Sequence, residues 1–135
     1  MRISELAADC GVTAKTIRFY EQSGLLPPPP RTTGGYRDYP PEAATRLSFI
    51  RDAQAAGLTL AEIRSILTVR DSGRAPCGHV SELIQQHLAD IEQRMAELRT
   101  TRTALRRLAE RAADTDPSTC SEADICSVIA GPATR

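Results

Sequence analysis

The side chains best suited to metal or redox chemistry are three cysteines and one histidine. They lie before and after a long segment in which apolar residues recur at regular spacing among polar ones. Cys77 and His79 stand two residues apart, and Cys120 and Cys126 lie near the C-terminus with five residues between them. Thiolates are soft ligands that select monovalent copper, zinc and heavier thiophilic ions, and imidazole adds affinity for zinc-like ions. Three sulfurs would suit mercury, lead or cadmium, whereas three sulfurs and one imidazole form a set known for zinc. These four residues are therefore the candidate metal ligands.

Two other kinds of chemistry are open to the same side chains. Cys120 and Cys126 could form a reversible disulfide, which would make the protein a redox or nitrosative sensor. Cys77 and His79 could instead serve as nucleophile and base in an enzyme. The enzyme is disfavoured because the sequence shows no third residue to orient the base. Cys10, which follows the first predicted helix, is expected to be a small core residue.

Composition places the chain among ordinary folded proteins. Its 135 residues are 41% hydrophobic and 25% charged, which suits one small domain with an extension. The 17 basic and 17 acidic side chains give a net charge of zero, divided as +2 over residues 1–70 and −2 over residues 71–135. No apolar run is long enough to cross a membrane, and the N-terminus lacks the apolar core of a secretory signal. We therefore expect a cytoplasmic protein with no membrane partner.

The N-terminal residues predict two short helices joined by a tight turn. Ser4 is the expected N-cap of a first helix that runs to about Asp9 and stops at Gly11. Thr13 is the expected N-cap of a second helix over residues 14–22, which carries cations on one face. This arrangement is the helix-turn-helix pattern of DNA-binding proteins.

The next segment predicts a hairpin and two more helices. Gly34-Gly35 is typical of a two-residue β-hairpin turn. Pro40-Pro41 opens a third helix, and Thr59 with Glu62 forms a capping box that begins a fourth. The apolar positions expected to be buried on these two helices are Ala43, Leu47, Ile50 and Ala53, then Ile63, Ile66 and Leu67.

A coiled-coil seam follows the polar break at residues 71–77. Apolar side chains recur at alternating spacings of four and three residues, with one arginine among them. The helix predicted over residues 78–113 is about 54 Å long and cannot bury this seam by itself. We therefore expect a homodimer, and an antiparallel one, because closed two-fold symmetry is the commonest assembly. The seam positions are Ile84, Leu88, Ile91, Met95, Leu98, Arg102, Leu105, Ala109 and Ala112.

Six segments of the first half of the chain recur in one order and register in a known family. They are Ile3-Ser4-Glu5-Leu6-Ala7, Thr16-Ile17-Arg18-Phe19-Tyr20-Glu21, Gly24-Leu25-Leu26-Pro27-Pro28, Gly35-Tyr36-Arg37-Asp38-Tyr39, Ile50-Arg51 and Gly57-Leu58-Thr59-Leu60-Ala61-Glu62-Ile63. With these segments residues 1–70 strongly resemble the MerR family of transcriptional regulators. The resemblance implies a winged helix-turn-helix DNA-binding domain, followed by an antiparallel coiled-coil helix over 78–113 and a C-terminal effector tail over 114–135.

The resemblance also implies partners and contact residues. A regulator of this family binds double-stranded promoter DNA as a homodimer and distorts it so that RNA polymerase can use an overlong spacer. By position, the recognition-helix contacts would be Lys15, Thr16, Arg18 and Tyr20, and the wing contacts would be Tyr36 and Arg37. These side chains suit the task, because arginine can bind guanine or phosphate and tyrosine hydroxyls can donate to phosphates.

The cysteine placement resembles that of the metal-sensing branch of the family. In that branch a cysteine at the head of the dimer helix accompanies divalent ions, so Cys77 implies zinc, cadmium, lead or mercury. The 22 residues after position 113 are too few for a small-molecule effector domain. Because about 54 Å of helix separates Cys77 from its own tail, and seven extended residues reach only about 25 Å, Cys77 is expected to meet Cys120 and Cys126 of the partner subunit.

Overall fold

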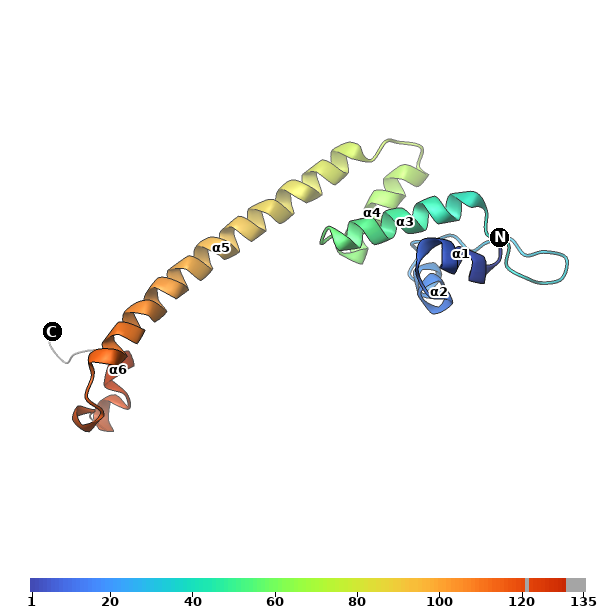
Figure 1. Cartoon of the computed structure of the whole chain (residues 1–135). Helices are drawn as coiled ribbons and strands as arrows, with labels where there is room; N and C mark the ends of the chain where they lie inside the picture. Colours follow the sequence, from blue (N-terminus) through green and yellow to red (C-terminus); the bar gives the residue numbers. More distant parts are fainter. Residues whose placement is uncertain (121, 131–135) are drawn as a thin grey trace. The chain divides into compact units, whose positions relative to one another are not determined.

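The computed structural model describes residues 1–120 and 122–130, which are mainly α-helical (Figure 1). The chain divides into two compact units, Met1–Ile84 and Gln85–Arg135. No strand occurs in the described ranges, so the predicted mainly-α fold class is confirmed. The elements are α1 (Ile3–Cys10), α2 (Ala14–Gln22), α3 (Pro41–Ala55), α4 (Leu60–Asp71), α5 (Cys77–Asp114), the short 3₁₀ turns η1 (Pro117–Thr119) and η2 (Glu122–Asp124), and α6 (Ser127–Ala130).

The turn between α1 and α2 is set by two local signals. Gly11 adopts a φ of 67°, the left-handed conformation that ends α1, and the Thr13 hydroxyl accepts the Thr16 amide hydrogen at 3.1 Å as the N-cap of α2. The prediction that Ser4 caps α1 is wrong. The helix begins at Ile3 with Arg2 as its N-cap, because the Glu5 carboxylate accepts the Arg2 amide hydrogen at 3.4 Å and so completes the first turn earlier.

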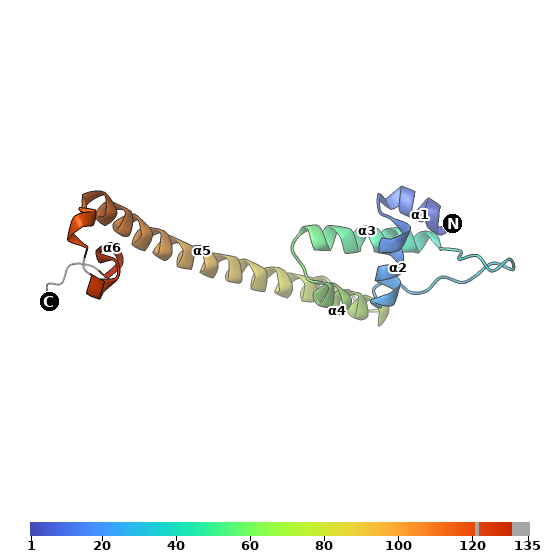
Figure 2. The ribbon, with the colours of Figure 1, turned by 90° about the horizontal axis from the view of Figure 1, so that it is seen from below.

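The loop between α2 and α3 contains a turn, but it is not the predicted two-residue hairpin. Arg31 and Arg37 form a single antiparallel bridge, and the Thr32 amide donates to the Tyr36 carbonyl at 2.7 Å. The Gly35 amide donates to the Thr32 carbonyl at 2.9 Å, and Gly35 has a φ of 83°. These bonds define a three-residue turn over 33–35 that ends in a left-handed glycine. Figure 2 shows the loop extending away from α1, α2 and α3.

Helices α3 and α4 supply the core of the first unit, as the apolar spacing predicts. All seven positions expected to be buried on these two helices are buried. The capping box is present, since the Thr59 hydroxyl accepts the Glu62 amide hydrogen at 3.1 Å and the Glu62 carboxylate accepts that of Thr59 at 2.8 Å. The core also contains Leu6, Ala7, Ile17, Tyr20, Leu25, Leu26 and Tyr39.

Three arginines of the first unit hold backbone carbonyls at or just beyond helix ends. The Arg64 guanidinium donates to the Ser23 carbonyl at 3.0 and 2.7 Å, at the C-terminus of α2. Arg51 donates to the last carbonyl of α1, and Arg46 donates through Nε to the Leu25 carbonyl at 2.6 Å. The last carbonyls of a helix have no partner inside it, so these side chains complete the ends of α1 and α2. The guanidinium groups of these three arginines therefore stabilise the fold.

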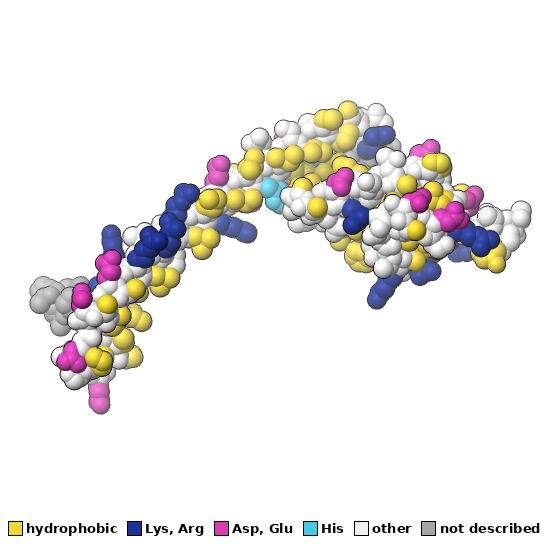
Figure 3. Space-filling model, viewed as in Figure 1, with side chains coloured by type: hydrophobic (Ala, Val, Ile, Leu, Met, Phe, Trp, Pro, Cys, Tyr) yellow, Lys and Arg dark blue, Asp and Glu magenta, His cyan; other side chains and the backbone are white. Residues whose placement is uncertain are grey.

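Helix α5 carries an apolar stripe that the single chain leaves in water. Large seam side chains are 46–68% exposed, and Figure 3 shows hydrophobic atoms following the helix. The exposed members are Ile84, Leu88, Ile91, Met95, Leu98 and Leu105. Among the described helices, none combines the length and the apolar character that crossing a membrane requires.

The tail folds back within the second unit. Arg111 of α5 donates to the Val128 carbonyl of α6 at 2.7 Å, and the Thr115 hydroxyl donates to the Arg111 carbonyl at 2.6 Å. Asp116 accepts the Ser118 amide hydrogen at 3.0 Å, which caps η1 and lowers the pKa of the Asp116 carboxyl below its usual range. The segment that carries Cys120 and Cys126 is therefore a folded turn attached to the end of α5.

Candidate DNA-binding face and metal centre

The exposed face of α2 presents the cations predicted to read DNA. Lys15 and Arg18 are exposed. Phe19, which is not among the predicted contacts, is exposed as well. Thr16 is partly buried, and its hydroxyl lies 3.0 Å from that of Thr13 at the N-cap. The structure thus leaves Lys15 and Arg18 as the two charged groups of this helix that point outward.

Tyr20, also predicted as a recognition-helix contact, lies in the core. Its side chain is only 5% exposed, and its hydroxyl donates to Gln54 Oε1 at 2.6 Å. A phosphate contact would require this hydroxyl to leave Gln54. The burial follows from helical spacing, because Ile17 and Tyr20 lie three residues apart on the inward face of α2.

The loop places one aromatic ring in solvent beside a cation. Tyr36 is 58% exposed, and the Arg2 guanidinium lies 4.7 Å from the centre of its ring, which is cation–π geometry. Arg31 donates to the Gly35 carbonyl at 2.8 Å across the base of the turn. The predicted contact Tyr36 is therefore displayed at the loop together with two further cations.

Arg37, the second predicted wing contact, is engaged inside the unit. Its Nη1 lies 2.8 Å from Glu21 Oε2 of α2 and 3.3 Å from the Tyr39 hydroxyl, and that hydroxyl donates to the other oxygen of Glu21. The Glu21 side chain is only 9% exposed. Burial and the hydrogen bond to Glu21 raise the pKa of Tyr39, while the bond to Tyr39 raises the pKa of Arg37. Sequence reasoning missed Glu21, because only the fold brings it to Arg37.

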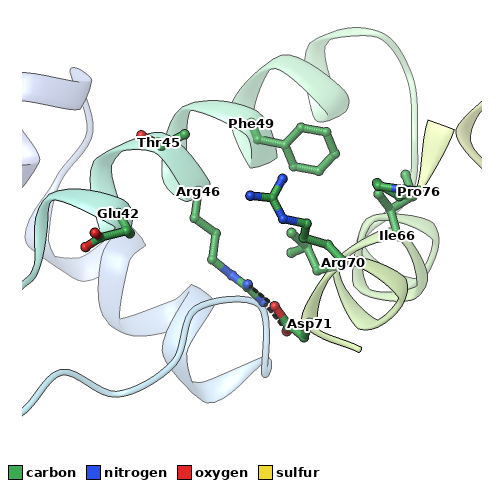
Figure 4. Close-up of a pocket in the computed structure, with 9 residues that line it drawn as sticks. Glu42, Thr45, Arg46, Phe49, Ile66, Arg70, Asp71 and Pro76 are labelled. Atoms are coloured by element: carbon green, nitrogen blue, oxygen red, sulfur yellow. Dashed lines mark hydrogen bonds and ion pairs between the residues drawn. The ribbon is translucent and has the colours of Figure 1, made fainter. Parts of the chain in front are cut away.

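A cleft of about 420 Å³ lies between α3 and α4 (Figure 4). Phe49 and Arg70 line it on opposite helices, and Arg46 makes a bidentate ion pair with Asp71 at 2.7 and 3.0 Å. The hydrogen bonds from Arg46 lower the pKa of Asp71. No cysteine or histidine lines this cleft, so it does not share the candidate ligand set.

Cys77 and His79 lie together in the first turn of α5. Cys77 is exposed, and His79 is half-buried with its Nε2 atom 2.7 Å from the Ser65 hydroxyl of α4. A thiolate at a helix N-terminus is favoured by the partial positive charge of the free amide groups. Cys77 is therefore accessible to an ion, while one ring nitrogen of His79 already has a partner.

Cys120 and Cys126 share one turn of the second unit. The Ser127 amide donates to Cys120 Sγ at 3.3 Å, and this sulfur lies 3.7 Å from the Ile125 carbonyl. Ile125, next to Cys126, has a φ of 64°, a left-handed conformation that costs free energy for a β-branched residue. The Ser127 amide is one donor that can stabilise the negative charge of a metal-bound thiolate at Cys120, whereas the Ile125 carbonyl accepts from the neutral thiol.

Within the described ranges, no three histidine, cysteine or acidic side chains gather closely enough to hold an ion. Cys77 and His79 belong to the first unit, and Cys120 and Cys126 belong to the second. Cys10 packs against the core, with Sγ 3.9 Å from the Ala44 carbonyl. Burial raises the pKa of its thiol, which fits the predicted core role.

Two models of known protein families match the sequence of this chain. The model for MerR HTH family regulatory proteins matches residues 1–69, and the model described as MerR, DNA binding matches residues 44–108. The chain belongs to the MerR family. It is a DNA-binding transcriptional regulator and not an enzyme.

Its similarity is to metal-responsive members of the family. The HTH-type transcriptional regulator ZntR homolog of Haemophilus influenzae is 36% identical over 116 residues, which cover 86% of each chain. The mercuric resistance operon regulatory protein of Bacillus cereus is 41% identical, over 82% of this chain and 83% of the relative. The crystal structure of PbrR691 from Ralstonia metallidurans CH34 in complex with lead(II) is 38% identical, with a TM-score of 0.72 over 89% of this chain and 94% of that one.

The different surroundings of Arg18 and Arg37 predict different salt responses. In Arg18→Ala, the slope of log affinity against log salt should fall by about one per subunit, as expected for one lost phosphate contact. Arg37→Ala should weaken binding with a smaller change of slope, because the Arg37 charge is already paired with Glu21. Fluorescence anisotropy on an operator duplex selected in vitro, at several salt concentrations, measures both. Equal changes of slope would show that Arg37 contacts phosphate directly.

Proposed function

We propose that this regulator is a homodimer that senses a thiophilic divalent metal ion and transmits the signal to promoter DNA. In this proposal residues 1–70 read DNA, residues 78–113 dimerise and residues 114–135 form the sensor tail. The linker predicted over 71–77 is shorter in the structure, because α4 ends at Asp71 and α5 begins at Cys77. The observation that carries the proposal is α5, a 38-residue helix with an exposed apolar stripe and thiol ligands at or just beyond its two ends.

The apolar stripe supports dimerisation. Burial stabilises by about 25 cal/mol for each Å² of apolar surface removed from water, so six large exposed side chains on one helix favour association strongly. The spacing of four and three residues is that of a coiled-coil seam, which a second copy of the same helix complements. A two-fold dimer would place the same stripe on both sides of the interface.

The charges along α5 support an antiparallel arrangement. Residues 77–93 contain three acidic side chains and no lysine or arginine, whereas residues 94–111 contain six arginines and two glutamates. Figure 3 shows the basic side chains gathered on the C-terminal half of the helix. An antiparallel pair sets the acidic half of each helix beside the basic half of the other. A parallel pair would set six arginines beside six, which electrostatic repulsion disfavours.

Helix length supports a metal site shared between subunits. At 1.5 Å per residue, 38 residues span about 57 Å, and the six residue steps from Asp114 to Cys120 reach at most about 22 Å. Cys77 would then meet Cys120 and Cys126 of the partner subunit. Each dimer would hold two sites, one at each end of the paired helices.

The donor chemistry fits a divalent thiophilic ion. Three thiol groups suit zinc, cadmium, lead or mercury, and Cys77 and Cys120 are exposed to solvent. Relatives named for mercuric resistance and solved with lead(II) support the same class of ion. The bound ion would supply a cross-link between the head of one α5 helix and the tail of the other.

Regulation would follow from a change in the dimer that distorts the promoter. Lys15, Thr16, Arg18 and Tyr36 would contact the DNA, and Arg37 would hold the loop, in the role of a wing, against α2. Sequence-dependent bending costs of order 1–6 kcal/mol, which a metal-induced change in the dimer can redistribute. RNA polymerase would then use the realigned promoter. Because its target is promoter DNA, we place the protein in the cytoplasm.

Metal sensing and redox sensing by Cys120 and Cys126 predict different responses. The reduced protein should bind two ions per dimer and activate transcription in vitro when zinc, cadmium, lead or mercury is added under reducing conditions. Mild oxidation followed by thiol counting tests the redox alternative. Activation that requires loss of two thiols per chain, with no response to any of the four ions, would contradict metal sensing.

Mixed dimers test whether the site is shared. One chain carries Cys77→Ser, and a differently tagged chain carries both Cys120→Ser and Cys126→Ser. Neither mutant homodimer should bind metal tightly, but the mixed dimer should regain one complete site, because the intact tail of the first chain meets the intact Cys77 of the second. Metal stoichiometry on the purified mixed dimer measures this. Zero recovered sites in an intact dimer would refute both the shared site and the antiparallel pairing.

A further inference from the structure

A hydrogen bond connects α4 to the first turn of α5 beside Cys77. Ser65 Oγ lies 2.7 Å from His79 Nε2 and 2.6 Å from the carbonyl oxygen of Glu62. Ser65 and His79 are both half-buried, and both belong to the first unit. The contact therefore joins the DNA-binding unit to the turn that carries a candidate metal ligand.

Proton counting fixes the direction of this bond. A serine hydroxyl has one hydrogen, and the Glu62 carbonyl can only accept, so Ser65 donates to Glu62. The His79 Nε2 atom must then carry a hydrogen and donate to Ser65. Nε2 is thus engaged while the bond is made, whereas Nδ1 keeps its lone pair.

The first turn of α5 is a place where an additional stabilising contact matters. It follows the non-helical segment 72–76, and it contains Gly78, which loses more backbone freedom in a helix than any other residue. Within the first unit the turn is held by the Val80 amide, which donates to the Pro76 carbonyl at 2.9 Å, and by Leu83, which is 8% exposed. The Ser65–His79 bond adds a link from this turn to α4. Its loss would let the turn fray and Cys77 move.

We infer that Ser65 and His79 are a positioning pair that holds the Cys77 thiolate in place for the ion, and that the His79 side chain acts through this hydrogen bond. This inference rests on the proposed metal-sensing function. It assigns the histidine of the Cys-Gly-His sequence to the connection between the sensor and the DNA-binding unit. The turn that carries Cys77 is then already ordered before the ion binds, so less conformational freedom is lost on binding.

Two substitutions of His79 separate positioning from ligation. In His79→Gln the amide nitrogen lies near the place of Nε2 and can still donate to Ser65, whereas in His79→Asn it lies near the place of Nδ1 and cannot. Ser65→Ala removes the acceptor. Thr68→Ala is the matched control on α4, because that hydroxyl donates to the Arg64 carbonyl and the threonine side chain is exposed.

Cadmium(II) is the probe, and its affinity for each reduced dimer is measured by competition with a chelator. Loss of one hydrogen bond predicts that Ser65→Ala and His79→Asn weaken cadmium binding by roughly three- to tenfold, while His79→Gln and Thr68→Ala stay within about twofold of wild type. The Ser65→Ala/His79→Asn double variant should be no weaker than either single variant. The thiolate-to-cadmium absorption should be unchanged in all of them, and sedimentation should confirm intact dimers.

The opposite pattern would overturn the inference. If His79 instead binds the ion through Nδ1, His79→Gln should lose affinity as strongly as His79→Asn, and by more than Ser65→Ala does. A long-range ¹H–¹⁵N spectrum of the metal-free protein gives an independent reading, since the inference requires the Nε2–H tautomer in wild type and the Nδ1–H tautomer would refute it. A wild-type protein that binds none of zinc, cadmium, lead and mercury would instead refute the proposed metal sensing, whatever tautomer the spectrum shows.

Discussion

The apolar stripe on α5 is the constraint on which the rest of the account depends. Its six large side chains are about half exposed in the single chain, and exposure of so much apolar surface to water is unfavourable in free energy. In the proposed dimer a second α5 helix would bury it, and the separation of acidic and basic halves along the helix would select the antiparallel direction. The proposed shared metal site, and the presence of two DNA-binding units in one dimer, follow from that direction.

The first unit is built so that few of its charges are free. Arg46, Arg51 and Arg64 hold backbone carbonyls, and Arg37 is paired with Glu21. Because residues 1–70 carry a net charge of only +2, DNA binding by the proposed dimer would depend on focused contacts from α2 and the loop of each copy. Because the DNA contacts are few, a change in the proposed dimer would alter the DNA without a large change in affinity.

Local signals predicted much of the fold. The N-cap at Thr13, the Thr59–Glu62 capping box and the buried positions of α3 and α4 depend on residues three or four apart, and the structure contains all of them. Contacts between residues far apart in sequence could not be predicted in this way, which is why the hydrogen bond from the Tyr20 hydroxyl to Gln54 was missed, although helical spacing already turns Tyr20 inward. The pairings of Arg37 with Glu21 and of His79 with Ser65 were missed for the same reason. The predicted Ser4 cap was wrong by two residues and the Gly34-Gly35 turn by one, because nearby side chains and carbonyls offered alternative hydrogen bonds.

Sedimentation equilibrium of the wild-type protein and a Leu98→Glu variant tests the central claim most directly. Leu98 lies in the middle of the stripe and is 68% exposed in the single chain, so a charge there should disrupt the paired helices without disturbing the core of the first unit. The account predicts a wild-type dimer at micromolar concentration and a folded variant monomer that no longer binds operator DNA. A wild-type monomer at that concentration, or a variant dimer with unchanged operator binding, would contradict it.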